Sequence, residues 1–265
     1  STFIHPFDDE DVIAGQGTIG LELLDQLKDM DAVIVPIGGG GLISGVAFAI
    51  KSLNPKIKVY GVQSSGAPSM FNSIKNKKIE RLPGVATIAD GIAVKEPGQN
   101  TFAICSKYVD EVVTVTDDEV SSAILSLIEK QKLIAEGAGA VAVAAAMFNK
   151  VPIKGKKVVC VVSGGNIDVT ILDRVIKRGL LTAGRSYALT IELLDKPGQL
   201  LKISQIIAGH GGNVISVHHE RANASMDING CFLRVNMETR NFAQVDEINK
   251  ALLKAGFRIL ENNKL

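Results

Sequence analysis

The chain has 265 residues, 46% of them hydrophobic, and its 29 basic and 28 acidic residues give a formal net charge of +1. This length suits one large or two ordinary domains, and the balanced charge argues against nucleic acid or an anionic membrane surface as a partner. We expect neither a membrane span nor a signal peptide, and we expect a cytoplasmic protein whose Cys105, Cys160 and Cys231 are buried reduced thiols.

Strands and helices alternate over the first two-thirds of the chain. Short β-branched runs predict strands, and apolar residues at helical spacing predict helices. The expected strands are 32–36, 58–63, 111–115 and 157–162, and the expected helices are 17–28, 42–52, 68–75, 98–106, 117–131, 138–148 and 168–178. Because the strands are continuously apolar, the pattern predicts a doubly wound α/β domain with a mostly parallel sheet covered on both faces.

The pattern changes after Arg185. Alternating apolar residues predict strands at 187–193, 213–219, 231–237 and 257–260. A helix lies between the first two strands and another between the last two, which is the β-α-β-β-α-β order of a ferredoxin-like domain. We therefore expect a first domain at residues 1–182 and a second at residues 183–265.

Four consecutive glycines follow the first strand. Gly38, Gly39, Gly40 and Gly41 precede a helix that starts at Leu42, and no charged residue stands among them. Glycine lets a ligand approach the backbone, and a helix N-terminus offers unpaired N–H groups to an anion. The loop lacks the Lys-Ser/Thr of a Walker A motif and the acidic residue of a dinucleotide fingerprint. It predicts a phosphate site of another type.

Two further loops carry polar side chains. Ser163 follows the strand at 157–162, and Glu136 stands before an alanine-rich helix. Ligands of parallel α/β sheets bind at the carboxyl ends of the strands, so one ligand can reach both Ser163 and the glycine loop. Two simpler roles stay open, because Ser163 also suits a helix-entry turn and Glu136 also suits the positive end of a helix dipole.

These segments resemble known families. Three segments are similar to pyridoxal-phosphate enzymes of the tryptophan-synthase-β type: Pro36–Gly45, Glu136–Ala140 and Ser163–Asn166. Three others resemble threonine ammonia-lyases more closely: His5–Asp9, Ala14–Thr18 and Thr87–Gly91. Two segments near the end of the chain resemble an ACT domain, which is an amino-acid-sensing module found in one branch of these lyases: Asp195–Leu200 and Gly211–Val214.

The resemblance implies a cofactor, a reaction and the roles of several residues. The cofactor is pyridoxal 5'-phosphate, whose phosphate is held by the backbone N–H groups of the glycine loop and Leu42, with Glu136 in the same site. The Ser163 hydroxyl lies against the pyridine nitrogen. The implied reaction converts L-threonine, and more slowly L-serine, to a 2-oxoacid and ammonia.

The chain departs from the family at the lysine that carries the cofactor. That lysine belongs to a Ser-Phe-Lys-x-Arg-Gly segment, which the 265 residues do not contain. We therefore expect a piece of a longer protein, with no catalytic residue of its own and no activity by itself. The alternative is a regulatory fragment that binds an amino acid or mediates dimerisation without catalysis.

The resemblance also suggests ligands for the second domain and argues against a metal. Asp195, Asn213 and Val214 are the implied effector-binding residues, with isoleucine or valine as the effector, and a homo-oligomer is expected. An equally open interpretation is that this domain only dimerises. Related serine racemases hold a divalent cation after the strand at 58–63, but Gly61–Ser69 contains no carboxylate, so we expect no metal site.

Overall fold

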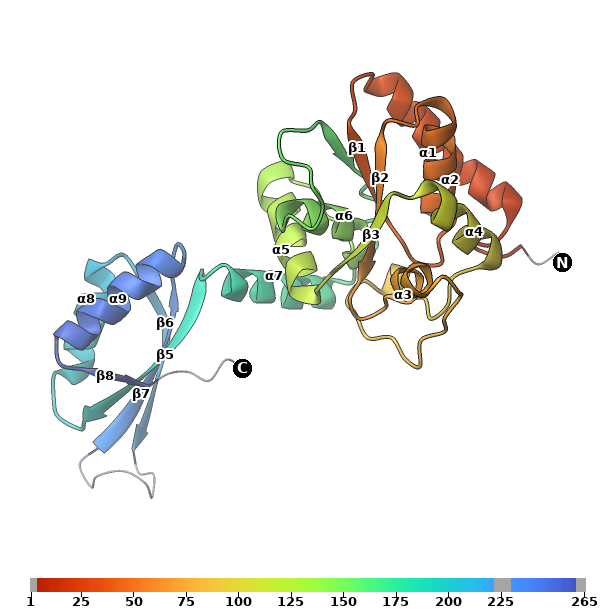
Figure 1. Ribbon diagram of the computed structural model, residues 1–265. Helices are drawn as coiled ribbons and strands as arrows, with labels where there is room; N and C mark the ends of the chain where they lie inside the picture. The colour runs from red at the N-terminus through yellow and green to blue at the C-terminus, as the bar shows by residue number, and fades with distance from the viewer. Residues whose placement is uncertain (1–3, 222–229, 261–265) are drawn as a thin grey trace. The chain divides into compact units, whose positions relative to one another are not determined.

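The computed structural model describes residues 4–221 and 230–260 (Figure 1). Its contacts divide the chain into two compact units, Ser1–Ile176 and Lys177–Leu265. The division falls inside one helix, α7 (Val169–Thr182). Each unit has its own four-stranded sheet and its own hydrophobic core.

The first unit is built on a parallel sheet, as the continuous apolar strands predict. Its strands are β1 (Ala32–Pro36), β2 (Lys58–Ser64), β3 (Glu111–Val115) and β4 (Val158–Cys160), in the order β3-β2-β1-β4. Every neighbouring pair is parallel. All five residues of β1 are buried, which places this strand in the centre of the unit.

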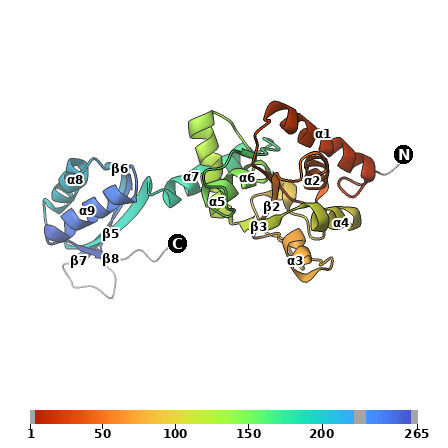
Figure 2. The ribbon, with the colours of Figure 1, turned by 45° about the horizontal axis from the view of Figure 1, so that its top comes forward.

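Helices cover both faces of this sheet (Figures 1 and 2). The α-helices besides α7 are α1 (Glu10–Gln26), α2 (Gly41–Leu53), α3 (Ser69–Asn76), α4 (Gln99–Tyr108), α5 (Asp117–Ser126) and α6 (Gly137–Met147). Val33 and Val35 of β1 pack in one core with α1 to α4, and Ala32 and Ile34 pack in the other core with α5, α6 and Val175 of α7. The alternation along β1 thus separates two apolar layers.

The first helix begins seven residues earlier than predicted. Asp9 is its N-cap, and the Asp9 carboxylate accepts hydrogen bonds from the N–H groups of Asp11 and Val12 at 3.0 and 3.2 Å. The prediction of a start at Gly17 was wrong because glycines at three positions of this segment weaken its apparent helix propensity.

Two other predicted elements are shorter in the structure. The helix expected over 117–131 is α-helical to Ser126 and continues as a π-helical turn over Leu127–Gln131. The strand expected over 157–162 is limited to Val158–Cys160, where it pairs with residues 32–34 of β1.

The second unit has the β-α-β-β-α-β order expected from its alternating pattern. Its elements are β5 (Ser186–Leu194), α8 (Gln199–Gly209), β6 (Asn213–Arg221), β7 (Gly230–Glu238), α9 (Phe242–Lys254) and β8 (Arg258–Leu260). The antiparallel sheet has the order β6-β7-β5-β8, and its buried residues pack against Ile203, Ile207, Ile248 and Leu252 of the two helices. None of the helices within the described ranges of the whole chain has the length and apolar character needed to span a bilayer.

Candidate functional site

A cleft of about 350 Å³ lies beyond the carboxyl ends of β1 and β4. The structure brings all seven predicted cofactor-binding residues to its wall. The lining residues are Pro6, Phe7, Pro36, Gly38, Gly39, Gly40, Gly41, Leu42, Gly91, Ile92, Val94, Glu136, Ala138 and Ser163. None of these lining residues is a lysine or an arginine, so the described wall offers an anion backbone N–H groups rather than cationic side chains.

The glycine loop turns sharply into helix α2. Gly40 is the N-cap with a φ of 104°, a left-handed conformation that glycine adopts without strain. The cap has no side-chain hydrogen bond, and within the described ranges the N–H groups of Gly39, Gly40, Gly41 and Leu42 have no hydrogen-bond acceptor. These groups lie at the positive end of the α2 dipole, where an anion such as a phosphate dianion would satisfy them.

Side chains at the loop glycines would collide with neighbouring residues. A Cβ at Gly38 would lie 3.2 Å from Cα of Ile92, and a Cβ at Gly39 would overlap the ring of Phe7. Glycine at these positions therefore lets Ile92 and Phe7 pack directly against the backbone of the loop. The residues present fit a phosphate group.

Phe7 is a site residue that sequence reasoning missed. Its ring lies against Gly39 and, edge to face, 4.5 Å from the ring of His5. The Nδ1 atom of His5 accepts a hydrogen bond from the N–H of Asp8 at 2.9 Å, which fixes this short turn. The segment His5–Asp9 was noted only for its resemblance, and the contact between Phe7 and Gly39 depends on tertiary packing.

Helix α4 ties this turn to the glycine loop. The Asp8 carboxylate accepts hydrogen bonds from the N–H groups of Gln99 and Thr101 at 2.9 and 3.1 Å, at the start of the helix. The buried Thr101 hydroxyl donates to the carbonyl oxygen of Gly39 at 2.7 Å. Asp8 and Thr101 therefore position the loop without lining the cleft, and the separation of about 90 residues hid them from sequence reasoning.

Glu136 packs closely against the loop after β4 because this loop has a glycine, Gly164, at the point of contact. The N–H of Glu136 donates to the carbonyl oxygen of Gly164 at 3.1 Å, and a Cβ at Gly164 would overlap the Glu136 carboxylate. A Cβ at Gly139 would lie 2.6 Å from the same Gly164 oxygen. Glu136 is the N-cap of α6 but makes no side-chain cap, so its half-buried carboxylate faces the cleft instead. Ser163 is exposed and lines the same cleft.

A hydrogen-bonded chain fixes the segment that carries Gly91. The Ser64 hydroxyl donates to the Thr87 hydroxyl at 2.7 Å, and Thr87 donates to the Asp117 carboxylate at 2.6 Å. The same carboxylate accepts from the N–H of Ile88 at 3.1 Å. Asp117 was noted in the sequence only as an acidic helix start, and it also holds the rim of the cleft.

The predicted effector residues do not meet in one chain. Leu194, which precedes Asp195, pairs with Gly230 of β7, whereas Asn213 pairs with Glu238 at the other end of the same strand. Within a single copy these residues therefore lie at opposite ends of the sheet, because β5 and β6 run parallel to each other and α8 connects the end of one to the start of the other. The Asn213 side chain instead donates to the Glu238 carboxylate at 3.0 Å.

Comparisons with known proteins identify the family of the chain. A family model described as pyridoxal-phosphate dependent enzyme matches residues 1–164. The L-threonine ammonia-lyases of Thermotoga maritima and Geobacter sulfurreducens are 49% and 46% identical to the chain over 98% and 97% of its length. The match covers 64% of each of these relatives, so the chain spans less than two thirds of their length.

Solved structures give the same family. The processed form of threonine deaminase isoform 2 from Solanum lycopersicum has a TM-score of 0.65 and 43% identity, covering 68% of this chain and 50% of that one. Maize serine racemase has a TM-score of 0.62 and 38% identity, covering 67% of this chain and 57% of that one. With a family model that spans more than half of its residues, the chain belongs to the pyridoxal-phosphate dependent enzymes.

Proposed function

We propose that the protein is a threonine ammonia-lyase, which converts L-threonine, and more slowly L-serine, to a 2-oxoacid and ammonia. Two relatives of that name match nearly all of this chain. The segments His5–Asp9 and Thr87–Gly91, which resemble the lyases in sequence, both lie at the cleft or hold its rim. Pyridoxal phosphate, when bound, supplies the electron sink that makes the α-carbon of an amino acid reactive.

One observation carries this proposal. Four N–H groups, those of Gly39 to Leu42, have no acceptor among the described residues, and their four residues line the cleft beyond the end of a buried strand. We assign the cofactor phosphate to them. In the same proposal the Ser163 hydroxyl hydrogen-bonds the pyridine nitrogen, and the Glu136 carboxylate accepts a hydrogen bond from the cofactor or the substrate.

We assign the lysine that holds the cofactor to a segment outside these 265 residues. The described residues of the cleft wall include no lysine, and no lysine of the 265 residues stands in the family's Ser-Phe-Lys-x-Arg-Gly context. We therefore propose that residues 1–265 bind the cofactor phosphate but do not turn over threonine by themselves.

A regulatory role for residues 183–265 is part of the proposal. The ferredoxin-like topology supports an ACT domain, with isoleucine or valine bound by Asp195, Asn213 and Val214. Because Asp195 and Asn213 lie at opposite ends of one sheet, a site that uses both takes them from two copies of the chain. This geometry supports a homo-oligomer. A melting-temperature screen across amino acids tests it, since one aliphatic amino acid should raise the melting temperature.

The lyase proposal is tested by supplying the lysine. The 265-residue polypeptide is assayed for 2-oxobutanoate formation alone and after fusion to the lysine-bearing segment of the Thermotoga maritima relative. We expect no turnover from the polypeptide alone and turnover of L-threonine by the fusion. A matched fusion whose transplanted lysine is replaced by alanine should be inactive. A folded fusion that binds the cofactor but releases no 2-oxobutanoate would contradict the assignment.

A further inference from the structure

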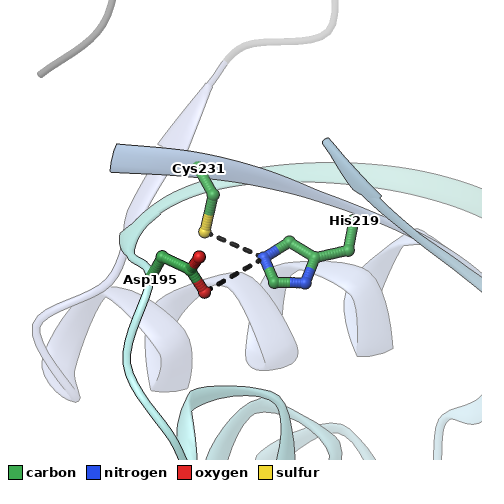
Figure 3. A group of neighbouring side chains, drawn as sticks. All are labelled: Asp195, His219 and Cys231. Atoms are coloured by element: carbon green, nitrogen blue, oxygen red, sulfur yellow. Dashed lines mark hydrogen bonds and ion pairs between the residues drawn. The ribbon is translucent and has the colours of Figure 1, made fainter. Parts of the chain in front are cut away.

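Three side chains with metal-binding chemistry meet at one end of the sheet of the second unit (Figure 3). Asp195 follows β5, His219 lies on β6 and Cys231 lies on β7. Cys231 pairs with Leu193 on β5, and His219 pairs with Leu233, two residues along β7 from Cys231. Because paired residues and residues two apart point to the same face of a sheet, His219 and Cys231 share one face.

The ligand atoms of these side chains converge. The Nε2 atom of His219 lies 3.0 Å from Sγ of Cys231 and 3.8 Å from Oδ1 of Asp195. The candidate ligand atoms of the three residues all lie within 4.8 Å of one another. Figure 3 shows a single ring nitrogen of His219 facing both the sulfur and the carboxylate, while the other nitrogen points away.

This spacing is close to that of a tetrahedral metal centre. Zinc binds thiolate sulfur at ~2.3 Å and imidazole nitrogen at ~2.0 Å, so the two ligand atoms stand ~3.6 Å apart around the ion. Widening the distance between Nε2 of His219 and Sγ of Cys231 from 3.0 Å by about 0.6 Å, through a shift of the His219 ring, reaches that separation. Sulfur, imidazole nitrogen and carboxylate oxygen together are a set that favours zinc and similar transition metals over magnesium or calcium.

The surroundings leave a position for a further ligand. A cleft of about 430 Å³ adjoins the cluster, and its wall includes Asp195, His219 and the loop Lys196–Leu200. Cys231 is fully buried, whereas Asp195 and His219 are exposed at the surface. An ion held here has the sulfur beneath it and the cleft beside it, so water or an external ligand completes its coordination.

We propose that Asp195, His219 and Cys231 form a binding site for a zinc-like divalent transition-metal cation with one open coordination position. The ion links the loop after β5 to β6 and β7 across the end of the sheet. The site does not depend on the lyase assignment, because every ligand comes from the second unit.

Cobalt provides a direct test on the untagged 265-residue chain. Titration with Co²⁺ at neutral pH should produce a sulfur-to-cobalt charge-transfer band and the visible bands of tetrahedral cobalt, saturating at one equivalent. Zn²⁺ should bleach these bands and raise the melting temperature of the chain. Absence of a sulfur-to-cobalt band from the folded wild-type chain would overturn the site.

Paired variants locate the ligands. Cys231→Ser should abolish the charge-transfer band, and His219→Gln should weaken cobalt binding at least tenfold. Cys160→Ser and His218→Gln should behave as the wild-type chain, because Cys160 belongs to the first unit and His218 points to the opposite face of β6. If circular dichroism shows that Cys231→Ser does not fold, the exposed His219 decides the matter: unchanged cobalt affinity in His219→Gln refutes the proposal.

Discussion

Gly39 serves two purposes at one backbone position. It lines the cleft with an N–H group that has no acceptor among the described residues, and its missing side chain leaves room for the ring of Phe7. The same residue accepts a hydrogen bond from the buried Thr101 hydroxyl through its carbonyl oxygen. The hydrogen bond from α4 thus fixes the backbone of the loop on one side, while the loop borders the cleft on the other. We expect this contact to hold the loop N–H groups in one conformation.

Substitution of Gly39 should weaken phosphate binding. Gly39→Ala forces either the loop or Phe7 to move, because the new Cβ would overlap the Phe7 ring. We expect at least about tenfold weaker binding of pyridoxine 5'-phosphate, which corresponds to ~1.4 kcal/mol, measured by calorimetry. Gly84→Ala is the control, since a Cβ at Gly84 meets nothing within 4 Å. Equal affinities of the two variants would contradict this role of Gly39.

Asp110 is a second residue whose contribution can be isolated. Its carboxylate lies 2.6 Å from Nζ of Lys51 and 2.8 Å from Nζ of Lys58, and it accepts the N–H of Val59 at 2.8 Å. Burial raises the pKa of Asp110, but the hydrogen bonds from Lys51, Lys58 and Val59 outweigh burial and hold its pKa below the ordinary value. The folded chain therefore favours the ionised carboxylate.

The resulting stability depends on pH in one direction. A lowered carboxyl pKa stabilises the fold above the ordinary aspartate value of about 3.9, and this stability is lost as the pH falls through the folded-state pKa. Asp110→Asn should lower the free energy of unfolding at neutral pH by about 1 kcal/mol, because solvent screens this partly exposed group, and the difference should vanish in acid. Urea denaturation followed by circular dichroism measures both.

Asp25→Asn is the matched control for Asp110→Asn. Asp25 pairs with Lys28 at the surface, where the two side chains are 86% and 76% exposed. Exposed pairs of this kind contribute less than about 0.5 kcal/mol. If Asp25→Asn and Asp110→Asn reduced the stability equally, the interpretation of Asp110 would be wrong.

At the scale of the elements, α1 and α2 pack through glycines. A Cβ at Gly17 would lie 3.2 Å from the carbonyl oxygen of Gly45, and one at Gly20 would lie 3.0 Å from Cβ of Ala49. A Cβ at Gly45 would overlap the carbonyl oxygen of Ile13. The glycines that lower the helix propensity of α1 thus allow α1 and α2 to pack closely in the fold.

This packing predicts opposite outcomes for two glycines. Gly45→Ala should lower the free energy of unfolding by about 3 kcal/mol, because the backbones of α1 and α2 must separate. Gly15→Ala should be neutral or stabilise the chain by up to about 1 kcal/mol, since a Cβ at Gly15 meets nothing within 4 Å and alanine favours the helix. Thermal denaturation of both variants provides the comparison, and a larger loss at Gly15 than at Gly45 would refute the close crossing.

Sequence periodicity located the elements whose pattern is local and missed the contacts that depend on the fold. The buried run of β1 and the glycine loop that follows it are readable in order along the chain, and so is the alternation of β5 and β7. The contacts of Phe7 with Gly39 and of Asp8 with Thr101 join residues far apart, and only packing shows them. The cluster of Asp195, His219 and Cys231 likewise forms only through the pairing of β7 with β5 and β6.

At the scale of the whole molecule, each unit has a complete set of local interactions of its own. The second unit has a closed apolar core between its sheet and the helices α8 and α9. We therefore propose that residues 183–265 fold alone, and that the boundary near residue 182 separates two independently folding domains. Circular dichroism of this segment should show a cooperative thermal transition, and a featureless melt would contradict the boundary.

The central claim is that backbone N–H groups of the glycine loop bind the phosphate of the cofactor. Amide chemical shifts of the isotope-labelled 265-residue chain, titrated with pyridoxine 5'-phosphate, test it most directly, because this compound has the phosphate but no aldehyde that could react with lysine. We predict saturable shifts centred on the amides of Gly39, Gly40, Gly41 and Leu42. If these amides stay unchanged at saturating ligand, or if the shifts centre on another part of the chain, the account is contradicted.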